Sequence, residues 1–151
     1  MNLIEQINKH KYLYVSGIIE PKDNAFRFII EQACLGENEF DVKNDSPIVT
    51  QLNQILADKN CFTYEVLFKT YIAYSVRNES YTQEDETEKF TGSLFRIYSE
   101  SHFLNYIRAS TIASDDYPGV FTHYEIVALN HIVDVVSTDL PNIKVLQPPT
   151  P

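Results

Sequence analysis

The sequence predicts an α+β fold in which long antiparallel strands form a sheet, with two or three helices packed on one face of it. The strongest pattern is a two-residue alternation of apolar side chains over residues 62–76, which is typical of a long, half-buried strand. The expected elements follow the order α-β-β-α-β-β-α-β, which lacks the strict alternation of parallel βαβ units. The length of 151 residues suits one domain, here residues 1–146, followed by a disordered Pro-rich tail over 147–151.

The first elements are a short helix and a hairpin. Leu3, Ile4 and Ile7 share one helical face, so a helix is expected there. Residues 12–19 and 25–34 are apolar and β-branched or aromatic, and a turn at Pro21 separates them. We expect these two segments to pair as antiparallel strands.

The middle of the chain combines a loop, a helix and the long strand. Residues 36–45 form an acidic loop, and Ser46 with Pro47 is typical of a helix N-terminus. The helix is expected to end near Asn60. The strand over 62–76 can stay whole or break in two, although no Gly or Pro interrupts it. One face of it carries Phe62, Tyr64, Val66, Phe68, Thr70, Ile72, Tyr74 and Val76.

The last third begins after a polar, acidic stretch over 78–89. Residues 93–98 are expected to form a strand, and Ser99 is expected to cap a helix that runs to about Ser110. A turn at 115–119 precedes a strand over 121–129. Residues 132–136 suit either a strand or a helical turn.

Charge narrows the possible partners. Lys and Arg number 12 against 21 Asp and Glu, so the formal net charge is -9 and the pI is about 4.8. Clustered cations are needed to bind phosphates, so neither nucleic acid nor an anionic membrane is an expected partner, and an acidic surface attracts basic proteins instead. The N-terminus resembles no signal peptide, and no apolar run approaches the roughly 20 residues of a membrane span, so we expect a cytoplasmic location.

The two cysteines lie among apolar neighbours. We expect Cys34 and Cys61 to be buried, free thiols in a reducing cytosol, although their spacing does not exclude a disulfide. Neither belongs to a CxxC motif, so redox and zinc chemistry are not expected.

Two groups of residues could carry chemistry, and each has a simpler explanation. His123, Glu125, His131 and Asp134 could gather a metal ion, but solvated polar groups at a strand edge explain them as well. Ser99, Ser101 and His102 fit helix capping better than nucleophilic catalysis. With no glycine-rich phosphate loop either, we predict no enzyme, no metal and no cofactor.

Acidic residues lie close to tyrosines at four places in the sequence, residues 64–65, 78–88, 98–100 and 115–117. Tyrosine offers large contact area at little entropy cost, and carboxylates accelerate association with a basic partner. The simpler alternatives are a solvated loop and tyrosines at the rim of the core. The predicted partner-binding residues are Glu79, Tyr81, Glu84, Asp85, Glu86, Glu88, Asp115, Asp116 and Tyr117.

Residues 64–81 (YEVLFKTYIAYSVRNESY) and 121–136 (FTHYEIVALNHIVDVV) resemble small bacterial proteins, and the chain is similar in size and acidity to immunity proteins of polymorphic-toxin and contact-dependent inhibition systems. That resemblance implies a cytoplasmic single domain that binds and neutralises one cognate toxin protein. A nuclease-type toxin is expected to be basic because it binds phosphates, and an acidic inhibitor would be attracted to it. The alternative is a small metal- or ligand-dependent enzyme that uses His123, Glu125 and His131. A subunit of a larger assembly is a third possibility, and the oligomeric state is not predicted.

Overall fold

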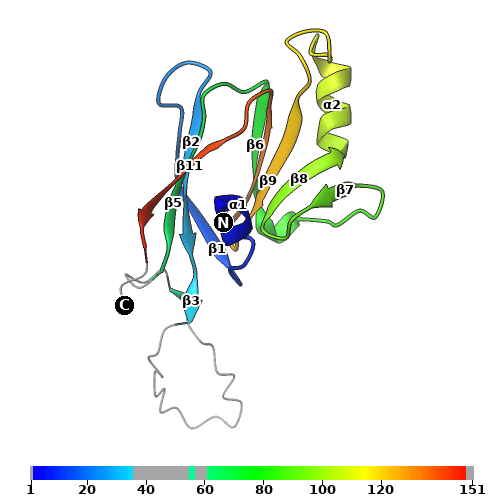
Figure 1. Ribbon diagram of the computed structural model, residues 1–151. Coiled ribbons are helices and arrows are strands. Elements are labelled where there is room, and N and C mark those ends of the chain that lie inside the picture. Colours follow the sequence, from blue (N-terminus) through cyan, green and yellow to red (C-terminus); the bar gives the residue numbers. More distant parts are fainter. Residues whose placement is uncertain (1, 36–54, 57–60, 149–151) are drawn as a thin grey trace, which may run out of the picture.

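The computed structural model describes residues 2–35, 55–56 and 61–148, and two antiparallel sheets dominate it (Figure 1). The four-stranded sheet has the order β1-β2-β5-β11 and the five-stranded sheet the order β6-β10-β9-β8-β7. A short pair, β3 with β4, stands apart from both. The strands are β1 (Leu13–Ile19), β2 (Phe26–Gln32), β3 (Cys34–Leu35), β4 (Ile55–Leu56), β5 (Thr63–Phe68), β6 (Ala73–Asn78), β7 (Lys89–Thr91), β8 (Phe95–Glu100), β9 (Thr122–Val127), β10 (His131–Ser137) and β11 (Asn142–Gln147).

The main core lies between the two sheets. Each strand turns alternate side chains inward, so apolar residues of both sheets meet in one cluster. The four-stranded sheet contributes residues such as Phe28 and Phe68, and the five-stranded sheet contributes Phe95, Tyr124 and Val133. The antiparallel α+β character is confirmed, but two sheets share the core where the sequence predicts one.

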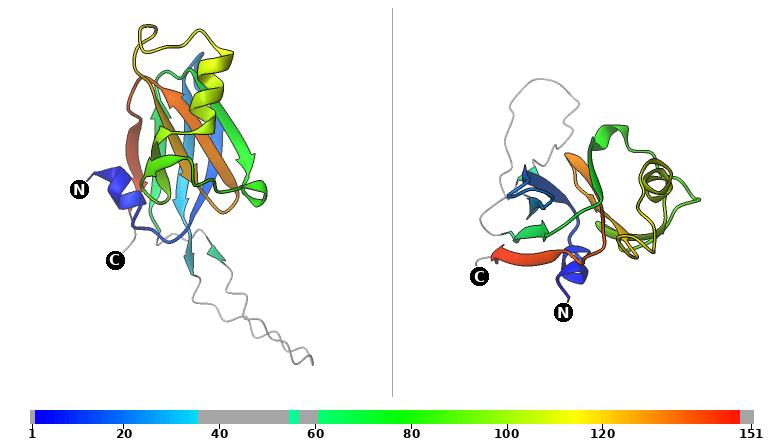
Figure 2. Two further views of the ribbon diagram at one scale, coloured as in Figure 1. Left: turned by 90° about the vertical axis from the view of Figure 1, so that its right-hand side faces the viewer. Right: turned by 90° about the horizontal axis from the view of Figure 1, so that it is seen from above.

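The helices occupy different places. α1 (Leu3–Ile7) is capped by Asn2, and η1 (Glu79–Tyr81) is a single 3-10 turn. α2 (His102–Ser110) covers the outer face of the five-stranded sheet (Figure 2), where Leu104 and Ile107 pack in a second apolar cluster. Among the described residues, no helix has the length and apolar character needed to cross a membrane.

The predicted cap of α2 is wrong by two residues. β8 continues to Glu100, so Ser99 is still in the strand, and the cap is Ser101. The Ser101 Oγ accepts the backbone N–H of Leu104 at 3.0 Å, as an N-cap does. Ser101 is buried, and its hydroxyl also contacts the His123 ring beneath the helix.

The long alternating segment breaks in two, the alternative that the sequence left open. β5 belongs to one sheet and β6 to the other, so the chain crosses between sheets at residues 69–72. The even-numbered face is fully buried in β5, where Tyr64, Val66 and Phe68 are all in the core. In β6 the same face still points toward the main core, because Tyr74 and Val76 lie opposite the core residues Val135 and Val133. Tyr74 and Val76 are nevertheless partly exposed, since β6 is an edge strand, and the odd-numbered face turns toward α2. The crossing therefore moves the strand to the other sheet without changing which side chains face inward, and alternation alone does not reveal it.

The remaining predicted elements have mixed outcomes. β1 and β2 pair antiparallel as expected, and residues 132–136 are strand. The helix predicted from Ser46 to Asn60 lies mostly outside the described residues, and it is wrong at Ile55–Leu56, which is β4. β11 was not predicted, because only one of its side chains is even half-buried and its apolar pattern is weak.

The prediction of free thiols is wrong, because Cys34 and Cys61 form a disulfide. Their apolar surroundings were read correctly for Cys61, which is buried, but burial suits a disulfide as well as a thiol. The bond ties Cys34 in β3 to Cys61, which lies two residues before β5. It therefore joins two positions 27 residues apart in the sequence by a covalent link.

Asn8, just after α1, fixes the start of β8. Its Oδ1 accepts the backbone N–H groups of Ser93, Leu94 and Phe95 at 3.0, 2.8 and 2.7 Å, and its Nδ2 donates to the Phe95 carbonyl at 3.0 Å. Gly92, at φ 92°, makes this turn possible, since a Cβ there would collide with the same carbonyl. The turn sets the position of Arg96 in the polar site.

Asn130, in the β9–β10 turn, joins the two sheets. Its side chain accepts the Val15 N–H at 3.0 Å and donates to the Val15 carbonyl at 2.8 Å. The neighbouring Leu129 N–H donates to the Leu13 carbonyl at 2.8 Å. The turn thereby occupies part of the outer edge of β1.

Candidate functional site

A row of charged side chains crosses the outer face of the five-stranded sheet beneath α2. Arg96 on β8 lies opposite Glu125 on β9, and Glu125 lies opposite Asp134 on β10. Cross-strand neighbours on one face have their Cβ atoms about 5 Å apart, so these side chains must interact. Their strand neighbours Tyr124 and Val133 face the opposite way, into the main core.

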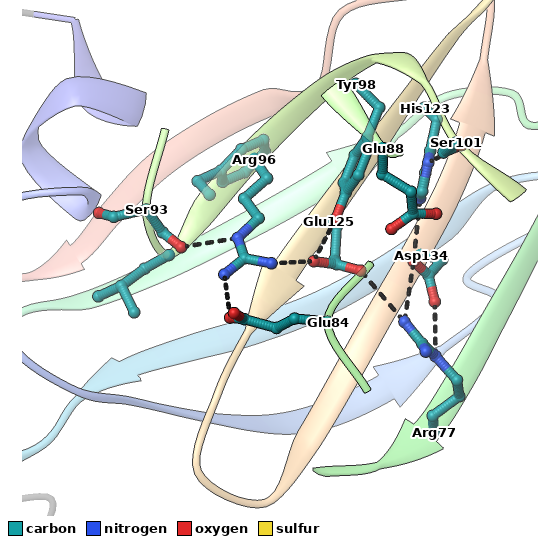
Figure 3. A network of polar contacts seen from close by, with 12 residues as sticks. Arg77, Glu84, Glu88, Ser93, Arg96, Tyr98, Ser101, His123, Glu125 and Asp134 are labelled. Atoms are coloured by element: carbon teal, nitrogen blue, oxygen red, sulfur yellow. Dashed lines mark hydrogen bonds and ion pairs between the residues drawn. The ribbon is translucent and has the colours of Figure 1, made fainter. Parts of the chain in front are cut away.

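Glu125 and Asp134, the acid pair, are buried and share Arg77, and Glu125 also pairs with Arg96 (Figure 3). Arg77 from β6 bridges both carboxylates: its Nη2 donates to Glu125 Oε2 and its Nε to Asp134 Oδ2, each at 3.1 Å. Arg96 donates to the other Glu125 oxygen at 3.3 Å, and the Tyr98 hydroxyl donates to that oxygen at 3.0 Å. Every carboxylate oxygen is therefore paired, as burial of charge requires.

His123 links the acid pair to the cap of α2. Its Nε2 is 2.9 Å from Asp134 Oδ1, and its Nδ1 is 2.8 Å from the Ser101 hydroxyl. An ionised Asp134 can only accept, so Nε2 carries the hydrogen and Nδ1 accepts from Ser101. Tyr98 stacks on the imidazole ring with centroids 4.4 Å apart, which fixes its plane.

The pKa values of Glu125 and Tyr98 in this cluster are both raised. Burial, followed by the neighbouring Asp134 carboxylate, raises the pKa of Glu125 in spite of its two arginines. The pKa of Tyr98 is also raised, mainly by burial. Glu125 thus holds a proton more strongly than an exposed glutamate would.

The cluster forms part of the lining of a pocket of about 510 Å³. Phe90, Phe103 and Tyr106 supply aromatic walls, and residues 82–88, the acidic loop, close one side. The lining residues include six carboxylates, Glu84, Asp85, Glu86, Glu88, Glu125 and Asp134, against two arginines, Arg77 and Arg96. The pocket is therefore acidic and partly aromatic, a combination that suits a cationic group.

The acidic loop is fastened to the N-terminus of α2. The Asp85 carboxylate accepts from Thr87 and lies 2.7 Å from His102 Nε2, and Glu88 accepts the His102 backbone N–H at 2.9 Å. Both contacts place negative charge at the positive end of the helix. The loop is thus an ordered wall of the pocket, held by His102.

This contact makes the loop pH-dependent. The hydrogen bond and charge of Asp85 raise the pKa of His102, and hydrogen bonds from Thr87 and then His102 lower the pKa of Asp85. The stabilisation from His102 is fully present below its unfolded pKa of about 6.5 and is lost as the pH rises through the higher folded value. The stabilisation that the ionised Asp85 contributes is present above its unfolded pKa and is lost as the pH falls through its lowered pKa in the folded protein.

We expect the NMR titration midpoint of His102 to lie above 6.5 in the native protein. In an Asp85→Asn variant it should fall back to about 6.5, because the charged partner is gone. His10, whose ring lies 2.6 Å from the Tyr64 hydroxyl of the other sheet, serves as the internal control, and its midpoint should be the same in both proteins. An unchanged His102 midpoint in Asp85→Asn would contradict the contact.

The structure separates the predicted site residues into three places. Glu84, Asp85, Glu86 and Glu88 line the pocket, whereas Glu79 and Tyr81 lie in η1, where Tyr81 is 86% exposed. Asp115, Asp116 and Tyr117 are exposed beyond the other end of α2, and Arg108 pairs with Asp115 at 3.0 Å. The acidic loop thus contacts the N-terminus of α2 and the segment with Asp115 contacts its last turn, whereas η1 precedes the loop in the chain.

The proposed metal ligands come together only in part. Among the described residues, His123, Glu125 and Asp134 are close enough to share an ion, and all three are buried. His131 is not among them, because it lies three residues before Asp134 on β10 and so faces the other side of the sheet. Moreover, Arg77 and Arg96 already supply positive charge to the same carboxylates, which opposes a divalent cation.

Sequence reasoning missed the basic half of the site. No role was predicted for Arg77 or Arg96, and Tyr98 was grouped with the tyrosines beside acidic residues. The carboxylates of the acid pair that these three side chains contact are 27 or more positions away. One signal was present: Asp134 interrupts the apolar run Ile132–Val136, and a carboxylate in a buried strand needs a partner.

Comparison of the chain with protein-family models, curated proteins and solved structures gave no match.

Proposed function

We propose that this chain is a protein-binding inhibitor of the immunity type, which binds a basic toxin domain on the face that carries α2. The observation that supports this most is the pocket beneath α2, with six carboxylates against two arginines and three aromatic walls. The net charge of -9 points to the same class of partner. Three exposed tyrosines offer anchors for a docked protein: Tyr106 on α2, Tyr117 beyond its C-terminus and Tyr81 in η1.

The structure sharpens which charges should steer this partner. Asp85 and Glu88 are engaged with α2. Glu84 and Glu86 are exposed on the loop, and Glu84, with 86% of its side chain exposed, makes an ion pair with Arg96 at 3.7 Å. Exposed rim charges act mainly on the association rate, because they attract the partner before contact. Tyr81 is expected to act on dissociation instead, as an aromatic anchor does.

We expect Glu84→Gln with Glu86→Gln to slow association with the toxin domain encoded by the neighbouring gene, by about 3–10-fold at low salt, and to flatten the salt dependence. Tyr81→Ala should speed dissociation. Stopped-flow kinetics over a range of ionic strength measure both effects. A charge-matched control is Glu5→Gln with Asp23→Asn, in α1 and the β1–β2 turn, which should leave the kinetics unchanged. If the control double variant slows association as much as the loop double variant, only net charge matters, and the acidic loop is not part of the interface.

A second candidate, a small enzyme, is favoured by the hydrogen-bonded chain of Ser101, His123 and Asp134. Such a chain activates a serine nucleophile when the hydroxyl can reach a substrate. Here Ser101 is buried and caps α2, and Glu88 occupies the next N–H, which an oxyanion would need. Labelling of Ser101 by a fluorophosphonate, or stoichiometric metal lost in His123→Ala, would favour the enzyme over the inhibitor.

The compartment in which binding occurs has a direct test. The sequence predicts the cytoplasm, whereas a disulfide such as Cys34–Cys61 is typical of oxidising compartments. Alkylation of thiols in intact cells before lysis distinguishes the cytoplasm from an oxidising compartment. Two alkylated cysteines per chain support the cytoplasm, and a protected disulfide places the protein in an oxidising compartment.

A further inference from the structure

Arg77 occupies the acid pair in a way that differs from Arg96. Arg96 is mostly buried; its Nε donates to the Ser93 carbonyl at 3.1 Å, and its guanidinium lies over the Phe90 ring at 4.4 Å. Arg77 comes from the edge strand β6, and 45% of its side chain is exposed. Its guanidinium is thus inserted from the solvent side, while the carboxylates that it contacts are more than 90% buried.

The acid pair has the shape that a guanidinium requires. Two carboxylates on directly paired strands present oxygens that Arg77 bridges with Nε and Nη2, each at 3.1 Å (Figure 3). The planar guanidinium fork matches such a pair, whereas the ammonium of lysine is a point charge. His123 and Tyr98 hold the two acids from behind, so the oxygens keep their places when the cation leaves.

We propose that the acid pair is a guanidinium receptor, which Arg77 fills in the free protein and an arginine side chain of the basic partner fills in the complex. This inference rests on the proposed function for the identity of the partner, but the receptor itself can be tested without one. Arg77 loses little when it is displaced, because it is already half in water. The incoming arginine enters a pocket with Phe103 and Tyr106 on its walls, where cation–π contact is available.

The receptor is tested by chemical rescue with methylguanidinium. Arg77→Ala should lower the Tm by roughly 4–8 °C, because it leaves buried carboxylates without their cation. If the vacated site binds the probe with a Kd of about 1 mM, about 10 mM methylguanidinium chloride should restore roughly 3–6 °C. Methylurea, which has the same shape without charge, and tetramethylammonium, which has charge without the fork, should restore little.

A matched variant controls for general effects of the probe. Arg108 has the same exposed fraction, 45%, and pairs with the exposed Asp115. Arg108→Ala should therefore show no shift specific to methylguanidinium. If Arg77→Ala proves too unstable to measure, Arg77→Lys provides the same test, because lysine keeps the charge but cannot bridge both acids.

The outcomes separate the receptor from the proposed function. Rescue by methylguanidinium alone, absent in Arg108→Ala, supports the receptor whatever the partner is. Equal shifts with methylurea or tetramethylammonium, or in Arg108→Ala, overturn it, while the steering experiment on Glu84 and Glu86 still decides whether a basic protein binds. If both hold, Arg77→Ala should bind an arginine-containing toxin more tightly than the native chain, because the internal competitor is gone. Weaker binding would show that Arg77 itself contacts the partner and would overturn the displacement.

Discussion

Phe68→Ala should lower the free energy of unfolding by about 3–5 kcal/mol, the range for removing a fully buried aromatic ring. Phe68 has no exposed surface, and its ring packs against Tyr124 of the other sheet with centroids 5.4 Å apart. The cavity would therefore open in the middle of the contact between the sheets. Urea unfolding followed by circular dichroism measures the loss.

The neighbouring residue supplies the control for this experiment. Lys69 is exposed where the chain leaves β5, so Lys69→Ala should change the stability by less than about 0.5 kcal/mol. Similar losses for the two variants would contradict the inward orientation of Phe68 and with it the packing of the two sheets.

Removal of the disulfide should have an effect of similar size. Replacing Cys34 and Cys61 together with alanine should cost about 3–4 kcal/mol, because the bond closes a loop between residues 27 positions apart and so restricts the unfolded chain. Reduction of the native protein should lower the urea midpoint to that of the double variant. Reductant should leave the double variant unchanged.

A loss below about 1 kcal/mol would mean that the bond hardly constrains the unfolded chain. An effect of reductant on the double variant would indicate that the reagent acts elsewhere on the protein.

The parts of the fold that sequence could predict are those set by local alternation. The β1–β2 hairpin and the buried face of β5 follow from side chains two residues apart, and both are confirmed. The crossing at residues 69–72 could not be predicted, because alternation is identical whether a strand stays in one sheet or enters another. Nor could the disulfide, since spacing along the chain does not fix which cysteines meet.

The candidate site was predictable by residue type but not by partnership. His123 and Glu125 are two residues apart in the strand predicted over 121–129, and in β9 both line the pocket from one face. Arg77 reaches Glu125 only because β6 and β9 both flank β10, which is a property of the sheet order. Ion pairs between strands that are distant in the sequence depend on the sheet order, which the sequence pattern does not show. The net charge of the chain therefore includes Glu125 and Asp134, although both are buried and paired with arginines.

The contact between Asn130 and β1 has a consequence for the behaviour of the chain in concentrated solution. An edge strand offers unpaired N–H and carbonyl groups to any other strand that approaches, and such pairing starts aggregation. At Val15, in the middle of β1, the Asn130 side chain satisfies one donor and one acceptor, as a neighbouring strand would. The β9–β10 turn of the other sheet therefore blocks this part of the β1 edge, so that a strand of a second molecule cannot pair with it. The contact thereby helps to keep the folded chain from polymerising through β1.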